Sequence, residues 1–134
     1  MKRVLIVEDV PEIRRLVRLA IGNHHVYESA SAEDALNQVA DLGGVDLLVL
    51  DIMLSGSSDG LALLATVRAH PVWSATKVIM LTARGSAEDR AASAVLGADA
   101  YFTKPFSPLQ LNDCIDELLS AEPLSATVTH RFET

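Results

Sequence analysis

Short apolar runs that end in polar or charged residues constrain this chain more than any other feature of its sequence. Four runs of this kind are Val4–Val7 before Glu8 and Asp9, Leu47–Leu50 before Asp51, Val78–Leu81 before Thr82, and Ala100–Thr103 before Lys104. Apolar runs of this length are typical of strands buried on both faces. Because segments of helical period separate them, they predict βαβ units and a parallel sheet.

A fifth, weaker strand and five helices complete the expected fold. His25–Ser29 has the composition of a strand, and helix starts are indicated by Pro11, Ser31, Ser86 and Ser107. The first helix should bury a stripe made of Ile13, Leu16, Val17, Ala20 and Ile21, and the last helix one made of Leu111, Cys114, Ile115 and Leu118. We therefore expect one α/β domain in residues 1–121 and a C-terminal tail, or the start of a linker, in residues 122–134.

Composition narrows the classes of function. The chain has 134 residues, 18 acidic and 11 basic side chains, and a net charge of -7. This balance argues against nucleic-acid binding through this domain, because such affinity depends largely on cationic contacts to phosphate. The lone Cys114 fits a reducing compartment, and Glu8 makes the amino-terminal apolar stretch too short for a signal peptide. With no run long enough for a membrane span, we expect a cytoplasmic protein.

Acidic side chains at the ends of two strands define a candidate site. The ligand crevice of an open parallel sheet lies outside the carboxyl ends of its strands, so Glu8, Asp9 and Asp51 should gather there. Their mutual repulsion calls for a shared proton or a cation, and carboxylates, a backbone carbonyl and waters suit Mg²⁺. With the metal bound, Asp51 stays ionised and one of its oxygens is free to attack an electrophile.

Thr82 and Lys104 supply groups of complementary chemistry at the same edge. Lys104 is a mobile point charge that can reach a transferred phosphoryl group, and Thr82 can donate a hydrogen bond to one of the phosphoryl oxygens. Phosphoryl transfer chiefly requires positioning and neutralisation of charge. These residue types therefore favour the formation of an acyl phosphate on Asp51.

In this order and at these spacings, the motifs resemble a response-regulator receiver domain of bacterial two-component signalling over residues 2 to 120. The motifs are Glu8-Asp9, Asp51, Asp59-Gly60, Thr82-Ala83 and Lys104-Pro105-Phe106. The resemblance implies a doubly wound, flavodoxin-like sheet of strand order 2-1-3-4-5 with five helices. It also implies that Asp51 is the phosphoacceptor and that Asp9 binds Mg²⁺ directly. Glu8 would act through a metal-bound water, and the main-chain carbonyl of Met53 would complete the protein ligands.

The same resemblance implies how a signal would pass through the domain. Thr82 and Lys104 would hold a phosphoryl group received from a phosphohistidine on a sensor histidine kinase or a histidine phosphotransfer protein. Tyr101 stands where the family keeps its switch aromatic. We expect Thr82 to move toward the phosphoryl group and Tyr101 to fill the vacated space, which changes the surface of residues 86–119 for a downstream protein target. The domain would catalyse only its own phosphorylation and dephosphorylation, as a monomer or a phosphorylation-dependent dimer.

The segment before Asp59 departs from the family pattern. Proline usually stands four residues after the acceptor, where this chain has Ser55, and Ser57-Ser58 make the loop one residue longer than usual. This loop borders the metal site and the kinase-docking surface. The departure therefore bears on partner choice and phosphoryl lifetime, and leaves the acceptor unaffected.

Three other functions compete with this interpretation. A haloacid-dehalogenase-type phosphatase needs a second acid two residues after its nucleophile, where this chain has Met53. A flavodoxin-like flavin binder needs a phosphate-cradling loop after the first strand, where Glu8-Asp9 would repel phosphate. A pseudo-receiver that acts as a phosphorylation-independent interaction module would typically lack one of the acids, the threonine or the lysine.

Overall fold

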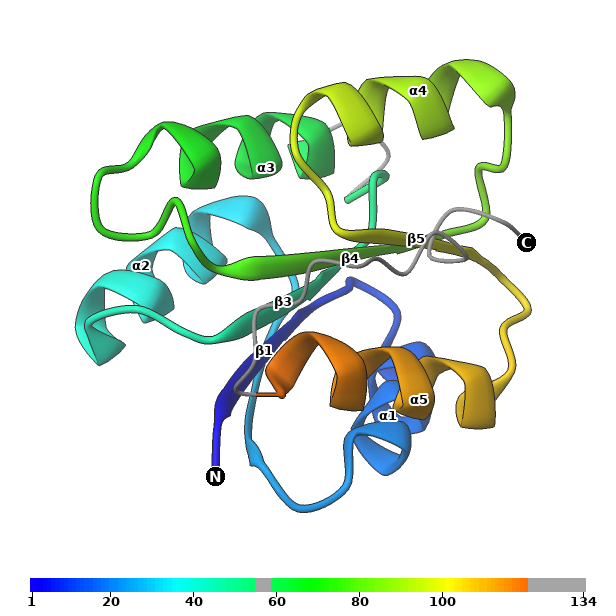
Figure 1. Ribbon diagram of the computed structural model, residues 1–134, viewed down its shortest axis with the longest axis horizontal. Helices are drawn as coiled ribbons and strands as arrows, with labels where there is room; N and C mark the ends of the chain where they lie inside the picture. Colours follow the sequence, from blue (N-terminus) through cyan, green and yellow to red (C-terminus); the bar gives the residue numbers. More distant parts are fainter. Residues whose placement is uncertain (55–58, 121–134) are drawn as a thin grey trace.

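The computed structural model describes residues 1–54 and 59–120 and shows a parallel sheet between two layers of helices (Figure 1). Strands and helices alternate along the chain in the order β1 (Arg3–Val7), α1 (Pro11–Ile21), β2 (His25–Ser29), α2 (Ala32–Leu42), β3 (Leu47–Leu50), α3 (Asp59–Ala69), β4 (Lys77–Thr82), α4 (Ala87–Val95), β5 (Ala100–Thr103) and α5 (Pro108–Leu119). The sheet order is β2-β1-β3-β4-β5, with every pair parallel. The doubly wound α/β fold expected from the sequence is confirmed.

Two apolar cores hold the layers together, one on each face of the sheet. α2 and α3 pack on one face, where Val39, Leu64 and Val67 meet residues such as Leu48 and Met80 of the strands. α1 and α5 cover the other face, where the buried residues include Val17, Ile21, Leu111, Cys114, Ile115 and Leu118. Burial of a large aliphatic side chain contributes about 1.5–3 kcal/mol, so these two cores supply the main stabilisation of the sheet.

Local signals in the sequence set most helix boundaries correctly. The hydroxyl oxygens of Ser31, Ser86 and Ser107 accept hydrogen bonds from backbone N–H groups three residues later, as N-caps do. Leu16 is the exception in the stripe expected for α1, because its side chain is 47% exposed. It faces a shallow groove between α1 and α5 with Leu19 and Leu109. The buried stripe of α1 is therefore narrower than the apolar periodicity of its sequence predicts.

Gly60 fixes the first turn of α3 against the end of β3. Its N–H donates to the carbonyl of Ile52 at 2.9 Å. A Cβ at this position would lie 1.9 Å from the carbonyl oxygen of Asp51, a distance that no side chain tolerates. Only glycine allows α3 to start this close to the backbone that carries Asp51.

The amino edge of the sheet, where the strands begin, is tied by Arg68 of α3. Its guanidinium donates to the carbonyls of Gly97, Ser74 and Thr76, and to Oδ2 of Asp99 at 3.0 Å. Gly97 has a φ of +100°, and a Cβ there would lie 2.8 Å from Nε of Arg68. Asp99 in turn accepts the N–H of Val78 at 2.8 Å. One cation thus joins the loops that precede β4 and β5.

Candidate functional site

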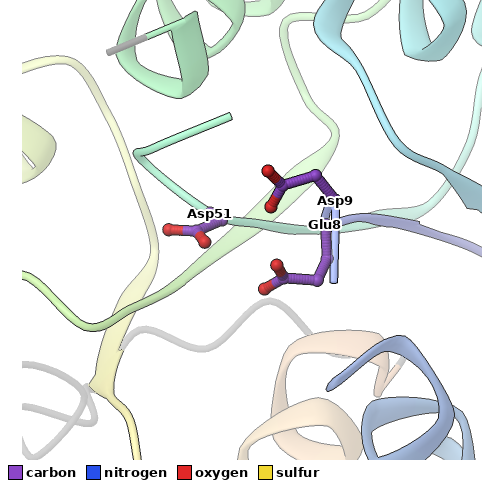
Figure 2. Close-up of side chains that lie close together, drawn as sticks. All are labelled: Glu8, Asp9 and Asp51. Atoms are coloured by element: carbon purple, nitrogen blue, oxygen red, sulfur yellow. The ribbon is translucent and has the colours of Figure 1, made fainter. Parts of the chain in front are cut away.

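The carboxyl edge of the sheet, where the strands end, gathers the three acids that the sequence placed there. Glu8 and Asp9 follow β1, and Asp51 follows β3. The register pairs Val7 with Leu50, so the next residues of the two strands are neighbours. One carboxylate oxygen from each acid lies within 4.8 Å of the other two. Figure 2 shows the three side chains projecting into the same space.

Lys104 brings a cation to two of these acids. It follows β5, and its backbone N–H donates to the carbonyl of Thr82 at 2.9 Å. Its Nζ lies 2.6 Å from Oε1 of Glu8 and 2.9 Å from Oδ2 of Asp51. The side chains of both acids are less than a tenth exposed, so solvent screens these ion pairs poorly. Positions 8, 51 and 104, far apart in the sequence, form one cluster.

Burial perturbs the charges of the Glu8–Lys104 pair. It raises the pKa of Glu8, although hydrogen bonds from Lys104 and from the backbone of Val10 oppose the shift. For Lys104, burial lowers the pKa, but hydrogen bonds to Glu8 and Asp51 outweigh it and the pKa is raised. The lysine therefore stays charged. The neighbouring carboxylates repel one another, and a second cation would reduce this repulsion.

Asp51 is held in a defined orientation at the end of β3. Its backbone N–H donates to the carbonyl of Val7 at 3.1 Å, which continues the pairing of β1 and β3. Its Oδ1 accepts the N–H of Met53 at 3.1 Å, and its Oδ2 accepts Nζ of Lys104. Both carboxylate oxygens are thus oriented by neighbours. Asp51 is 6% exposed, whereas the neighbouring Asp9 is exposed to solvent.

Thr82 lies at the end of β4 beside this cluster and is fully buried. Its Oγ1 accepts the N–H of Arg84 at 3.2 Å. The hydroxyl hydrogen is therefore free of that contact and available for another acceptor. This geometry allows the phosphoryl contact that the sequence predicts for Thr82.

Tyr101 is also fully buried, and its hydroxyl donates to the carbonyl oxygen of Arg84. Burial raises the pKa of this phenol. The Arg90 guanidinium carbon lies 4.9 Å from the centroid of the ring. The ring thus lies inside the protein, and the switch role that the family resemblance implies for Tyr101 stays a prediction.

The sequence did not predict that Asp89, in the first turn of α4, forms an ion pair with Arg84 beside this site. Arg84 pairs with it at two points, Nε to Oδ2 at 2.8 Å and Nη2 to Oδ1 at 2.9 Å. Nη1 of Arg84 also lies 2.8 Å from the sulfur of Met53. The only signal in the sequence is an acid near a helix start, which is common at helix N-termini for other reasons.

The donor set fits a hard divalent cation. Three carboxylates with oxygens this close, at least one of them accessible to water, match the ligands that Mg²⁺ prefers. The carbonyl of Met53, two residues after Asp51, is the backbone ligand that the family resemblance implies, and this role stays a prediction. Ser55 and the longer loop through Ser57-Ser58 lie outside the described residues, as does the segment 122–134.

Comparisons with known proteins point to one family. Residues 4–116 match the model of the response regulator receiver domain. The chain is 44% identical over 107 residues to the transcriptional regulatory protein TcrA of Mycobacterium tuberculosis, covering 78% of this chain and 41% of TcrA. It is 40% identical over 113 residues to the phosphate regulon transcriptional regulatory protein PhoB of Klebsiella pneumoniae, covering 82% of this chain and 48% of PhoB. The chain thus spans less than half the length of these curated relatives.

Solved structures share the same architecture. A response regulator from Chloroflexus aurantiacus superposes with a TM-score of 0.81 at 32% identity, covering 88% of this chain and 97% of the other. The beryllofluoride-activated receiver domain of DrrB superposes with a TM-score of 0.79 at 29% identity, covering 89% and 97%. Within residues 1–54 and 59–120, no helix is both long and apolar enough to cross a bilayer.

Proposed function

The chain belongs to the response regulator receiver domain family of two-component systems, and from this premise we propose that Asp51 accepts a phosphoryl group from a phosphohistidine. The donor would be a sensor histidine kinase or a histidine phosphotransfer protein. The observation that carries the proposal is the contact of Lys104 with Asp51 beside two further acids. A carboxylate crowded by other carboxylates and held by a lysine has the environment of a nucleophile that must meet an anionic donor.

The transfer follows from the roles of the side chains. An oxygen of Asp51 forms a bond to phosphorus as the bond from phosphorus to the imidazole nitrogen of the donor breaks, and the imidazole keeps that electron pair. Lys104 neutralises charge on the transferred group, and the hydroxyl of Thr82 donates to one of its oxygens. Asp9, Asp51 and the carbonyl of Met53 would hold Mg²⁺, with Glu8 acting through a water. The metal, when bound, supplies positive charge beside the phosphoryl oxygens.

We further propose that the domain modifies only itself. Residues 1–121 would form the receiver, and phosphorylation would switch the surface of α4, β5 and α5 for a downstream protein. Residues 122–134 would form a tail or the start of a linker, and nucleic acid would not bind through this domain. The net charge of -7 supports that last point, because phosphate backbones repel an acidic surface. The receiver would work as a monomer or as a phosphorylation-dependent dimer.

Labelling of Asp51 tests this function. Wild-type protein incubated with phosphoramidate and Mg²⁺ should gain one phosphoryl group, measured by intact-protein mass spectrometry, and chelation of the metal should suppress the gain. Asp51→Asn should remove labelling because the amide is a poor nucleophile, with the fold unchanged by circular dichroism. Asp46→Asn, at the opposite edge of the sheet, serves as the matched control and should label as wild type does. Undiminished labelling of Asp51→Asn contradicts the assignment, and a chain that never labels would be a phosphorylation-independent interaction module.

A further inference from the structure

α4 differs from the other helices in what it buries. Its buried side chains are Asp89 and Ser93, one turn apart on the same face, and both are polar. α5, by contrast, buries Leu111, Cys114, Ile115 and Leu118. Since apolar burial is the main force that docks a helix, α4 depends on polar contacts to an unusual degree.

One of the two buried polar side chains, Ser93, has no hydrogen-bond partner within the described residues. Ser93 is fully buried, and its hydroxyl makes no hydrogen bond within the described residues. A buried hydroxyl in this condition destabilises the packing that contains it. The position of α4 is therefore weakly stabilised at its centre.

The other buried polar side chain, Asp89, is neutralised by Arg84, which precedes the helix. Asp89 receives two hydrogen bonds from Arg84, and the Arg84 hydrogen bond is the main cause of its lowered pKa. Without that cation the carboxylate would remain in a site where its side chain is only 11% exposed. An uncompensated buried charge is costly, so the helix end would have to move outward to hydrate it.

Arg84 itself belongs to the edge where the phosphoryl group would bind. Its backbone N–H contacts the hydroxyl of Thr82, and its Nη1 contacts the sulfur of Met53. The N–H of Met53 in turn contacts Asp51. The side chain of Arg84 is 39% exposed, which leaves it room to turn from one anion to another.

Resting on the proposed function, we propose that the guanidinium of Arg84 exchanges between two anions, the carboxylate of Asp89 and a phosphoryl group on Asp51, and that this exchange releases the N-terminal end of α4. A guanidinium binds phosphoryl oxygens at two points as readily as it binds a carboxylate. The phosphoryl group carries more negative charge than the carboxylate it replaces, so it competes effectively. Asp89 is thus a positioning residue, and it acts through Arg84.

Amide hydrogen exchange of α4 tests the proposal, with phosphoramidate as the donor and the labelled fraction measured in the same samples. Labelling of the wild type should speed exchange in residues 87–95 by about tenfold, as expected for the loss of roughly 1.4 kcal/mol of local stability. Asp89→Asn should label as wild type does, yet show no change of α4 exchange on labelling, because no buried carboxylate is left without its cation when Arg84 turns away. Arg84→Met should lose the response of α4 to labelling, whereas Arg84→Lys should restore it in part.

Two further variants separate this exchange from general loosening. Glu28→Gln removes the carboxylate that pairs with Arg14 and Arg18, and should leave the α4 response intact. Ser93→Ala removes the unpaired hydroxyl and should slow α4 exchange in the unlabelled protein about fivefold. A labelled wild type with unchanged α4 exchange, or an Asp89→Asn protein with the full wild-type response, overturns the exchange but not the proposed function. A wild type that never labels overturns both.

Discussion

Both edges of the sheet carry clusters of basic and acidic side chains, but the two clusters differ in their balance of charge. At the amino edge, Arg68 donates to three carbonyls and to Asp99, so one cation meets one carboxylate and several backbone oxygens. At the carboxyl edge, Lys104 meets Glu8 and Asp51, with Asp9 close by. The first arrangement is balanced and ties loops together. The second has more negative charge than its lysine neutralises, which is a feature of a site that binds a further cation.

Arg68→Ala should produce the largest change in stability. The substitution leaves Asp99 and three carbonyls without their donor, and we expect unfolding to require about 3 kcal/mol less free energy. Denaturation by urea gives this value, while the extent of labelling in native buffer should stay at the wild-type level. Arg18→Ala is the matched control, because its ion pair with Glu28 is more exposed and should contribute less than about 1 kcal/mol. Equal losses in the two variants would contradict a special role for the amino edge.

Lys104→Ala should have a smaller effect that depends on the metal. In the presence of chelator the variant should lose about 2 kcal/mol, because two poorly exposed carboxylates lose their shared cation. Mg²⁺ should then stabilise the variant more than the wild type, since the ion no longer competes with Nζ. Thermal unfolding with and without Mg²⁺ measures both quantities. A variant that responds to Mg²⁺ less than wild type does would show that the lysine supports metal binding instead.

Addition of Mg²⁺ to the wild type should raise stability by about 1.4 kcal/mol at a concentration ten times the Kd. The gain should disappear in Asp9→Asn and persist in Arg68→Ala, whose defect lies at the other edge. Thermal shift measurements over a range of Mg²⁺ concentrations provide the comparison. Persistence of the full gain in Asp9→Asn would remove Asp9 from the ligand set.

The pH dependence of Glu8 should be the smallest effect. Burial raises the pKa of Glu8 in the folded state, so its protonated form is favoured by folding. The resulting stability is present below the unfolded pKa and is lost as the pH rises through the folded pKa. In chelator, Glu8→Gln should therefore be more stable than wild type near pH 7, and this difference should disappear as the pH falls to the unfolded value of 4.5. A difference that grows as the pH falls would reverse the assigned direction.

The sequence predicted the carboxyl edge well because its information is local. Each strand ends where an apolar run meets a polar residue, and the parallel register carries Glu8, Asp51 and Lys104 to one place. The amino edge was not predicted. Arg68 and Asp99 are 31 positions apart in the sequence, and no local sequence pattern near either residue predicts their ion pair. Asp89 was missed for a related reason, since its burial depends on how α4 docks.

Leu16 shows the same limit for an apolar residue. The helical period places Leu16 on the inner stripe of α1, yet the groove beside α5 leaves it half exposed. Periodicity gives the direction of a side chain, but neighbouring elements decide how far it is covered.

The close approach of Gly60 to Asp51 has a consequence for how this region tolerates insertions. The hydrogen bond from Gly60 to Ile52 joins the two ends of the intervening segment, and the absence of a side chain keeps them in contact. Lengthening a closed loop by a residue costs only a small amount of conformational entropy. A change in the number of residues between these anchored ends would therefore leave the position of Asp51 unchanged.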